Sequence, residues 1–356
     1  MLSINKKLLI VLNGQSVWPP PVWLMRQAGR YLPEFRLLRQ QADFLTRCLT
    51  PDIAVEITLQ PIRRFAFDAA ILFSDILILP WALGQDLKFV EGKGPVLPSI
   101  QSEQDLQKLN PQQAIEKTEP VLEAIRRLNK IVNSPETIGT APAQSVTLIG
   151  FTGSPFTVAC YMVEGGSSKD FATVFKMMYE NPSLFDKIID LLVQTTANYL
   201  CRQIEAGAEA VKLFDSWGGL LPVNLFDKYV IQPTRQIVNI VKNKYPHIPI
   251  IGFPRLAGSK LQSYLDGTGL QTIGIDQTAD ISLLNKIIGS EIGFQGNLDP
   301  LCLLHNPNMM KQEIHNLCIE LKNRPHILNL GHGVLPTTPV EHVYELVNTV
   351  RNLKKD

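Results

Sequence analysis

The sequence is poor in cysteine and has no long apolar run. Its five cysteines, an odd number, are scattered without a C-x-x-C pair, which argues against a disulfide framework and favours a reducing compartment. No run approaches the roughly 18 apolar residues of a membrane helix. The short run LLIVL near the N-terminus is too brief for a secretory signal. We therefore expect a soluble, cytoplasmic protein that does not enter a membrane.

An excess of charge is also missing. The 34 basic residues nearly balance the 33 acidic ones, so the formal net charge is +1 and no global field attracts nucleic acid. No G-x-G-x-x-G or G-x-x-x-x-G-K-[ST] motif follows the early apolar runs, which weakens a nucleotide-binding interpretation. An anionic ligand would therefore have to be held by local cationic groups.

Short apolar runs are what the sequence does contain, and most are followed by a helical pattern. They are nearly continuous in Val, Ile, Leu and Phe, which is typical of parallel strands covered on both faces. The expected strands are 22–25, 69–75, 145–151, 210–216, 248–253, 272–276, 292–296 and 326–331. The expected helices are 52–65, 182–206, 227–245, 258–266, 281–288, 307–323 and 339–353.

Eight such strands predict an α/β protein with a (β/α)8 TIM barrel, in one domain over residues 1–356. A doubly wound sheet is the alternative. The proline-rich stretch 80–144 is the least regular part of the chain. We interpret it as a segment inserted after the second strand, with helix around 104–131.

Polar residues fall where several predicted strands end. Asp75 ends AAILFSD, Ser216 ends AVKLFDS, and His332 directly follows HILNLG. Arg26 and Arg30 follow the first strand and share a face in either a helix or a strand. Catalytic groups of barrels cluster at the carboxyl ends of the strands, so we expect these side chains to converge. Each also has a structural alternative, such as a helix cap, a turn hydroxyl or a surface ion pair.

Other candidate residues are less specific. Tyr161 follows the glycine-rich turn GFTGSP and offers a hydroxyl that can donate or accept a hydrogen bond. The remaining five histidines look like loop or helix-surface residues. Cys302, His305, His315 and Cys318 imitate a zinc pattern, but Cys318 fits the apolar face of a helix as a small hydrophobe. We expect no metal site.

Several blocks together resemble the uroporphyrinogen decarboxylase family. PVWLMRQAGRYLPEFR (21–36) and GFTGSPFTVACYMVEGG (150–166) resemble its two signature segments. ILFSD, LFDSWGG, GNLDP and NLGHGV match further blocks in the same order. The resemblance implies a single-domain (β/α)8 barrel, a homodimer, and no metal or organic cofactor. It also implies removal of four acetate carboxylates from uroporphyrinogen III to give coproporphyrinogen III and CO2 in heme synthesis.

The resemblance further implies a set of site residues. Asp75 matches the aspartate that faces the pyrrole NH groups, and Arg26 and Arg30 match arginines that hold substrate carboxylates. These three are the predicted catalytic residues, the arginines mainly through positioning. The predicted substrate-binding residues are Arg26, Gln27, Ala28, Arg30, Ile71, Phe73, Asp75, Tyr161, Ser216 and His332.

The sequence leaves three questions open. The general acid could be His332 or Tyr161, since neither is forced by its chemistry. The chain could instead be a barrel methyltransferase that uses zinc, a corrinoid protein and a thiol. It could also bind tetrapyrroles without catalysis.

Overall fold

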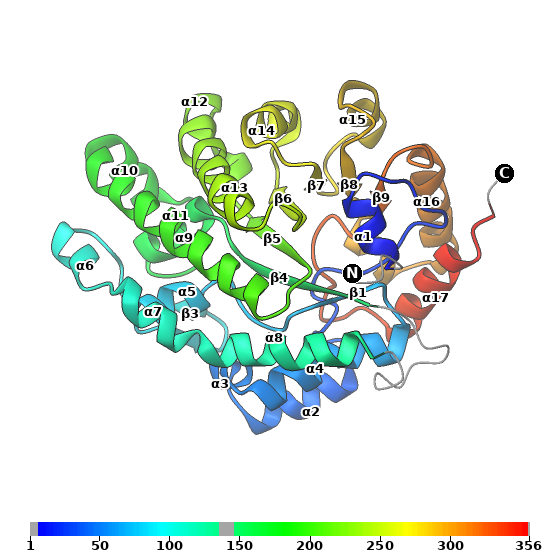
Figure 1. Ribbon diagram of the computed structural model, residues 1–356, viewed down its shortest axis with the longest axis horizontal. Helices are drawn as coiled ribbons and strands as arrows, with labels where there is room; N and C mark the ends of the chain where they lie inside the picture. Colours follow the sequence, from blue (N-terminus) through cyan, green and yellow to red (C-terminus); the bar gives the residue numbers. More distant parts are fainter. Residues whose placement is uncertain (1–5, 135–145, 355–356) are drawn as a thin grey trace.

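The computed structural model describes residues 6–134 and 146–354, in which a curled sheet of seven parallel strands is surrounded by helices (Figure 1). The strand order is β1-β4-β5-β6-β7-β8-β9, so strands follow the chain around the sheet. Their bounds are β1 Ala69–Ile71, β4 Thr147–Gly153, β5 Ala210–Asp215, β6 Ile250–Pro254, β7 Thr272–Gly274, β8 Gly293–Gln295 and β9 His326–Ile327. All seven coincide with predicted strands, although most are shorter than predicted.

The remaining predicted strand, 22–25, which comes first in the chain, is not a regular strand. Val22 makes only an isolated parallel bridge to Leu328, beside β9. On one side Leu328 N donates to Pro21 O at 2.9 Å, and on the other Asp68 N donates to Val22 O at 2.9 Å. This segment thus touches both edges of the sheet, but the seven regular strands do not close a barrel by themselves.

Helices connect successive strands and cover the outside of the sheet, as the sequence pattern predicts. Several begin with proline in the first turn, where a missing N–H costs nothing. The helices are α1 Lys7–Leu12, α2 Pro33–Gln41, α3 Phe44–Leu49, α4 Pro51–Phe65, α5 Ile78–Leu83, α6 Glu103–Gln107, α7 Pro111–Lys117, α8 Glu119–Val132, α9 Pro155–Glu164, α10 Ala172–Glu180, α11 Pro182–Glu205, α12 Val223–Phe226, α13 Gln232–Lys244, α14 Leu261–Thr268, α15 Ile281–Ile287, α16 Pro307–Glu320 and α17 Val340–Arg351. Among the helices of residues 6–134 and 146–354, none combines the length and the apolar character that spanning a bilayer requires.

The predicted insertion lies between β1 and β4 and is mostly helical. Its helices α6 to α8 fall on the stretch predicted as helix around 104–131. It also contains an unpredicted antiparallel hairpin, β2 Lys88–Val90 with β3 Gly94–Val96. Residues 135–144 of the predicted insertion lie outside the described residues.

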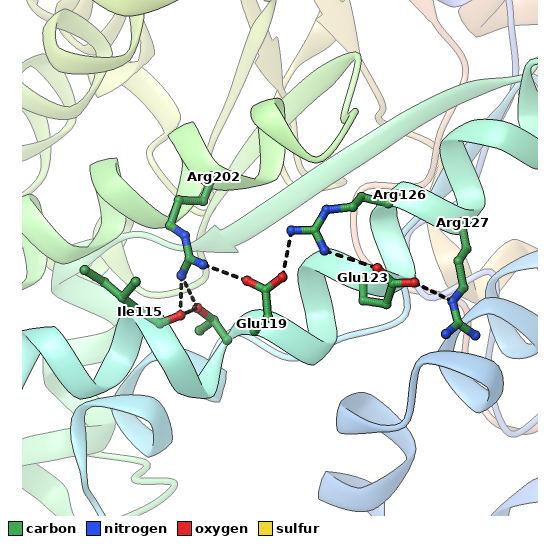
Figure 2. A network of polar contacts seen from close by, with 7 residues as sticks. Ile115, Glu119, Glu123, Arg126, Arg127 and Arg202 are labelled. Carbon is green, nitrogen blue, oxygen red and sulfur yellow. Dashed lines mark hydrogen bonds and ion pairs between the residues drawn. The ribbon is translucent and has the colours of Figure 1, made fainter.

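A network of ion pairs runs along α8 and joins this helix to α11. Arg202 of α11 donates to Glu119 of α8 at 2.8 Å, and Arg126 donates to the same carboxylate at 2.7 Å (Figure 2). Arg126 also reaches Glu123, which accepts from Arg127 at 2.8 Å. Each of these arginines therefore finds its counter-charge within the protein.

His326 and Cys318 are both buried in the fold, and only the second was expected to be. His326 was predicted at a loop or helix surface, but it is buried in β9, where Nε2 lies 3.0 Å from the Gly296 carbonyl oxygen. A short strand packed on both faces explains the difference. Cys318 is buried in α16, as its apolar position predicts. In the described part of the chain no group of three or more His, Cys, Asp or Glu side chains could hold a metal ion.

Candidate active site

A cavity of about 1080 Å³ opens at the carboxyl ends of the strands. Every residue predicted for the site lines it, from Arg26 near the N-terminus to His332 near the C-terminus. The predicted residues at its wall are Arg26, Gln27, Ala28, Arg30, Ile71, Phe73, Asp75, Tyr161, Ser216 and His332. The fold therefore brings together side chains as far apart in the sequence as Arg26 and His332.

The loop that carries Arg26 and Arg30 is held from below by two buried amides. Gln27 is fully buried, and its Nε2 donates to Ala69 O at 3.0 Å while its Oε1 accepts from Leu24 N at 3.1 Å. Asn329 Oδ1 accepts from Met25 N at 3.0 Å. Gln27 thus lines the cavity while its side chain fixes the loop, and Asn329 is a positioning residue that the sequence pattern did not single out.

Arg26 has an unusual backbone and a closely fitted side chain. Its φ is +59°, in the left-handed region that non-glycine residues seldom adopt. A Cβ on Gly333 would lie 2.3 Å from Arg26 Cδ, so glycine is needed there for the arginine to pass. Arg26 and Arg30 make no side-chain ion pair with the described residues, and both guanidiniums remain exposed to the cavity.

Asp75 lies after β1, with one carboxylate oxygen engaged and one free. Oδ1 accepts from Leu77 N at 2.8 Å, which fixes the turn that precedes α5. Leu77, not Asp75, occupies the N-cap position of α5, so the helix-cap interpretation of Asp75 is wrong. Oδ2 makes no hydrogen bond with the described residues. Burial raises the pKa of Asp75 to about 6, and Leu77 N and the nearby charge of Arg26 oppose that rise. The carboxyl is therefore mainly ionised at pH 7.

Tyr161 and His332 both carry no charge near neutral pH. Burial raises the pKa of Tyr161 to about 12, and the charge of Asp75 adds to that rise. Burial lowers the pKa of His332 to about 4, and the cations Arg26 and Arg255 lower it further. Tyr161 packs on Trp217 with ring centroids 4.5 Å apart. Both side chains can offer hydrogen bonds to a ligand, but neither is ionised at pH 7.

A second buried carboxylate, Asp215, lies just before Ser216 but outside the cavity lining. Its Oδ1 accepts from Thr157 Oγ1 at 2.6 Å and from Gly218 N at 2.9 Å, which fixes the turn after β5. Burial raises the pKa of Asp215 to about 6, the same value as Asp75. Asp215 therefore positions Ser216 through the backbone, whereas Asp75 faces the cavity.

A buried lysine lies one layer beneath the cavity. Lys212 is fully buried on β5, two positions before Phe214, so both side chains share one face of the strand. Its Nζ lies 4.8 to 5.2 Å from the ring centroids of Phe214, Phe253 and Trp23. Burial lowers the pKa of Lys212 well below its usual value. The three rings and Met25 Sδ, 3.7 Å from Nζ, therefore surround the amine beneath the cavity.

Two further arginines line the cavity that the sequence pattern did not single out. Arg39 is exposed at the end of α2, and Arg47 is buried in α3. The cavity thus offers four guanidiniums, Arg26, Arg30, Arg39 and Arg47, against the carboxylates of Asp43, Asp75 and Glu91. Their arrangement suits a ligand with several carboxylates.

Comparison with known proteins gives one consistent result. The family model described as "Uroporphyrinogen decarboxylase (URO-D)" matches residues 3–353. A protein of Gluconacetobacter diazotrophicus named uroporphyrinogen decarboxylase is 56% identical over 99% of this chain and 100% of its own length. One of Gluconobacter oxydans with the same name is 53% identical over 98% of this chain and 96% of its own length.

Among solved structures, a methyltransferase from Methanosarcina mazei has a similar fold. It superposes with a TM-score of 0.76 over 99% of both chains, at 17% sequence identity. At that identity the likeness concerns the fold alone.

Proposed function

The chain belongs to the uroporphyrinogen decarboxylase family and is an enzyme that decarboxylates uroporphyrinogen III in heme biosynthesis, and we propose that the reaction takes place in the cavity described above. The cavity is at the large end of small-molecule sites, as a macrocycle with eight carboxylates requires. The observation that carries the assignment is Asp75, whose one free carboxylate oxygen faces a cavity lined by Arg26 and Arg30, which form no ion pair with the described residues.

The fold, on this proposal, is a (β/α)8 barrel whose first strand is irregular. Residues 21–23 hydrogen-bond to the β9 side through Leu328 and to the β1 side through Asp68. They occupy the position of an eighth strand, although only Val22 pairs as one. This irregular pairing helps to place Arg26 in the cavity. The chain leaves the sheet after Val22 and turns at Arg26, whose side chain lines the cavity.

Asp75 is the group we assign to the centre of the macrocycle. Losing CO2 from an acetate arm leaves an electron pair, which a pyrrole ring accepts if a ring carbon is first protonated. A carboxylate that accepts the pyrrole NH bonds stabilises the resulting cation more than the neutral ring. The free Oδ2 of Asp75 supplies that acceptor, while the bond from Leu77 N holds the side chain in place.

Arg26 and Arg30 are assigned to the carboxylate arms of the substrate. Both line the cavity without a counter-ion among residues 6–134 and 146–354, and Gly333 leaves Arg26 the room to extend. Holding an arm fixes the pyrrole relative to Asp75. Tight binding of the reacting acetate would instead stabilise the negative charge of a carboxylate that must leave as CO2. We therefore assign the arginines mainly to positioning the substrate.

Two uncharged side chains, His332 and Tyr161, lie in the cavity where protons must be transferred. Each acetate carbon gains a proton after its carboxylate has left as CO2, and the ring carbon then releases the proton that it took up first. One proton is thus consumed for each CO2. His332 is neutral at pH 7 because its pKa is about 4, so it acts through a hydrogen bond rather than as a stored imidazolium. Tyr161 keeps its proton at pH 7, because its pKa is about 12, and it can donate a hydrogen bond to the substrate.

Anaerobic turnover of uroporphyrinogen III by chelator-treated protein tests the assignment. We expect coproporphyrinogen III, with the seven-, six- and five-carboxylate intermediates, by chromatography of the oxidised products. Activity that requires added zinc, or methyl transfer from a corrinoid protein to a thiol, would favour the methyltransferase alternative. Tight substrate binding without CO2 release would favour a tetrapyrrole-binding protein. The homodimer and the cytoplasmic location implied by the resemblance stay predictions, the former to be tested by sedimentation.

A further inference from the structure

Arg47 is a buried arginine at the cavity wall. It lies in α3, which begins after Asp43 caps its first turn by accepting from Thr46 N at 2.8 Å. Only 4% of Arg47 is exposed, yet the side chain lines the cavity that holds Asp75. A charged side chain is rarely buried this far unless something pairs with it.

The surroundings of Arg47 are aromatic rather than anionic. Its guanidinium carbon lies 5.2 Å from the ring centroid of Phe35, 5.4 Å from that of Phe44 and 6.0 Å from that of Phe73. Nε donates to Asp43 O at 3.3 Å. Nη1 is buried and has no hydrogen-bond partner within the described residues. These rings attract the cation but satisfy none of its donors.

The nearby anion does not neutralise Arg47. The Asp43 carboxylate is committed to Thr46, with Oδ1 on the backbone N–H and Oδ2 on the hydroxyl at 2.9 Å. No carboxylate of the described chain lies within ion-pair distance of Arg47. Burial lowers the pKa of Arg47, but a guanidinium keeps its charge at any physiological pH. Within the part of the chain that the structure describes, Arg47 is thus a buried cation without an ion pair and with at least one unused donor, which costs stability.

We propose that Arg47 binds a propionate carboxylate of the substrate, in a subsite formed by α2, α3 and β2; this inference rests on the proposed function. Phe35, Phe44 and Phe73 line the approach and suit the two methylenes of a propionate arm. Phe89 of β2 packs against Phe44 with the two ring planes tilted and their centroids 4.4 Å apart. The propionates remain on the substrate through all four decarboxylations, so Arg47 could bind one of them at every step. Binding the reacting acetate instead would stabilise its charged ground state and slow the loss of CO2.

The test compares Arg47→Met with Arg63→Met. Methionine fills the same apolar space without charge, while Arg63 lies on α4 in an exposed pair with Glu56, away from the cavity. We expect Arg47→Met to raise the KM for uroporphyrinogen III about 30-fold, the loss of a charged hydrogen bond, with little change in kcat. Its Tm should equal or exceed that of the parent protein, and Arg47→Lys should recover part of the KM. Arg63→Met should leave KM unchanged.

Inhibition by coproporphyrinogen III, which has propionates but no acetates, identifies the arm. A weaker inhibition of Arg47→Met supports propionate binding, whereas inhibition equal to that of the parent protein overturns it. An unchanged KM with a lower Tm also overturns the inference, because it would make Arg47 a structural residue. These outcomes require a parent protein that makes coproporphyrinogen III. A parent protein without turnover would instead overturn the proposed function.

Discussion

The arginines of the outer helices and the arginines of the cavity meet opposite surroundings. Arg126, Arg127 and Arg202 each reach a carboxylate within 3.1 Å, in the network of Figure 2. Arg26 and Arg47 have no such partner among the described residues, although Arg47 is far more buried than the outer three. The outer layer uses charge to hold helices together, while the cavity leaves its positive charge for a ligand at a cost in stability.

The largest effect should come from Asp75→Asn. Asparagine keeps an oxygen to accept from Leu77 N, so the fold is retained, but it loses the negative charge. We expect turnover to fall about 100- to 1,000-fold, measured as coproporphyrinogen III formed. Because the folded protein raises the pKa of Asp75 to about 6, its ionised form is disfavoured on folding and the variant should be at least as stable at pH 8.

The matched control is Asp215→Asn, which makes the same change in a carboxylate that does not line the cavity. Its Oδ1 can still accept from Thr157 and Gly218, so turnover should stay close to that of the parent protein. Near-normal turnover by Asp75→Asn, or equal losses in both variants, would remove the distinction between the two carboxylates.

Arg26→Ala should have the next largest effect. The left-handed backbone strain is similar for alanine and arginine, so the change reports on the side chain alone. We expect kcat/KM to fall about 10- to 100-fold, the value of a charge-assisted contact, and a comparable loss for Arg30→Ala. Arg126→Ala on α8 is the control and should retain full activity. Parent-level kcat/KM in both cavity variants would place these arginines outside the site.

A pH profile should show the titration of Asp75. Below its pKa of about 6 the carboxyl is neutral and no longer stabilises a pyrrole cation, so kcat/KM should fall about tenfold per pH unit. The pKa values of His332, about 4, and Tyr161, about 12, differ too much from 6 for either group to cause this fall in kcat/KM. Asp215 also has a pKa of about 6 and could cause the same fall in kcat/KM. If Asp75 is the group that titrates, the fall persists in Asp215→Asn. If the fall disappears in that variant, it belongs to Asp215.

The smallest catalytic effect should come from Arg202→Met in the outer network. Arg202 donates to the Ile115 carbonyl oxygen, to Thr118 Oγ1 and to Glu119, so its loss should reduce the free energy of unfolding by about 1 to 2 kcal/mol. Urea unfolding monitors that change, and steady-state kinetics should match those of the parent protein. A loss of turnover larger than twofold would mean that the outer layer and the cavity are coupled.

The sequence predicts the regular parts of this fold because the signals for them are local. Apolar runs specify the seven strands, and their polar ends place Asp75, Ser216 and His332 at one mouth. The first strand was overestimated because its irregular pairing depends on Asp68 and Leu328, which are distant in sequence. The hairpin β2–β3 was missed because its three-residue strands carry almost no apolar pattern.

Residues whose role depends on tertiary packing were missed in the same way. Arg47 reads as an ordinary helix-surface arginine until Phe35 and Phe73 close over it. Asn329 lies in the block NLGHGV, but nothing local indicates that its side chain accepts from Met25 N. A glycine-flanked motif such as this one indicates a constrained turn, without saying which distant backbone it holds.

The pairing of residues 21–23 with Leu328 affects the order in which the chain can fold during synthesis. Met25 N and its acceptor on Asn329 are 304 positions apart, which takes about 15 to 60 s to translate. Through that interval the backbone donors and acceptors around Trp23 have no neighbour on one side. Stalled nascent chains should be cleaved by protease within 17–30 until the segment around 330 has left the ribosome tunnel.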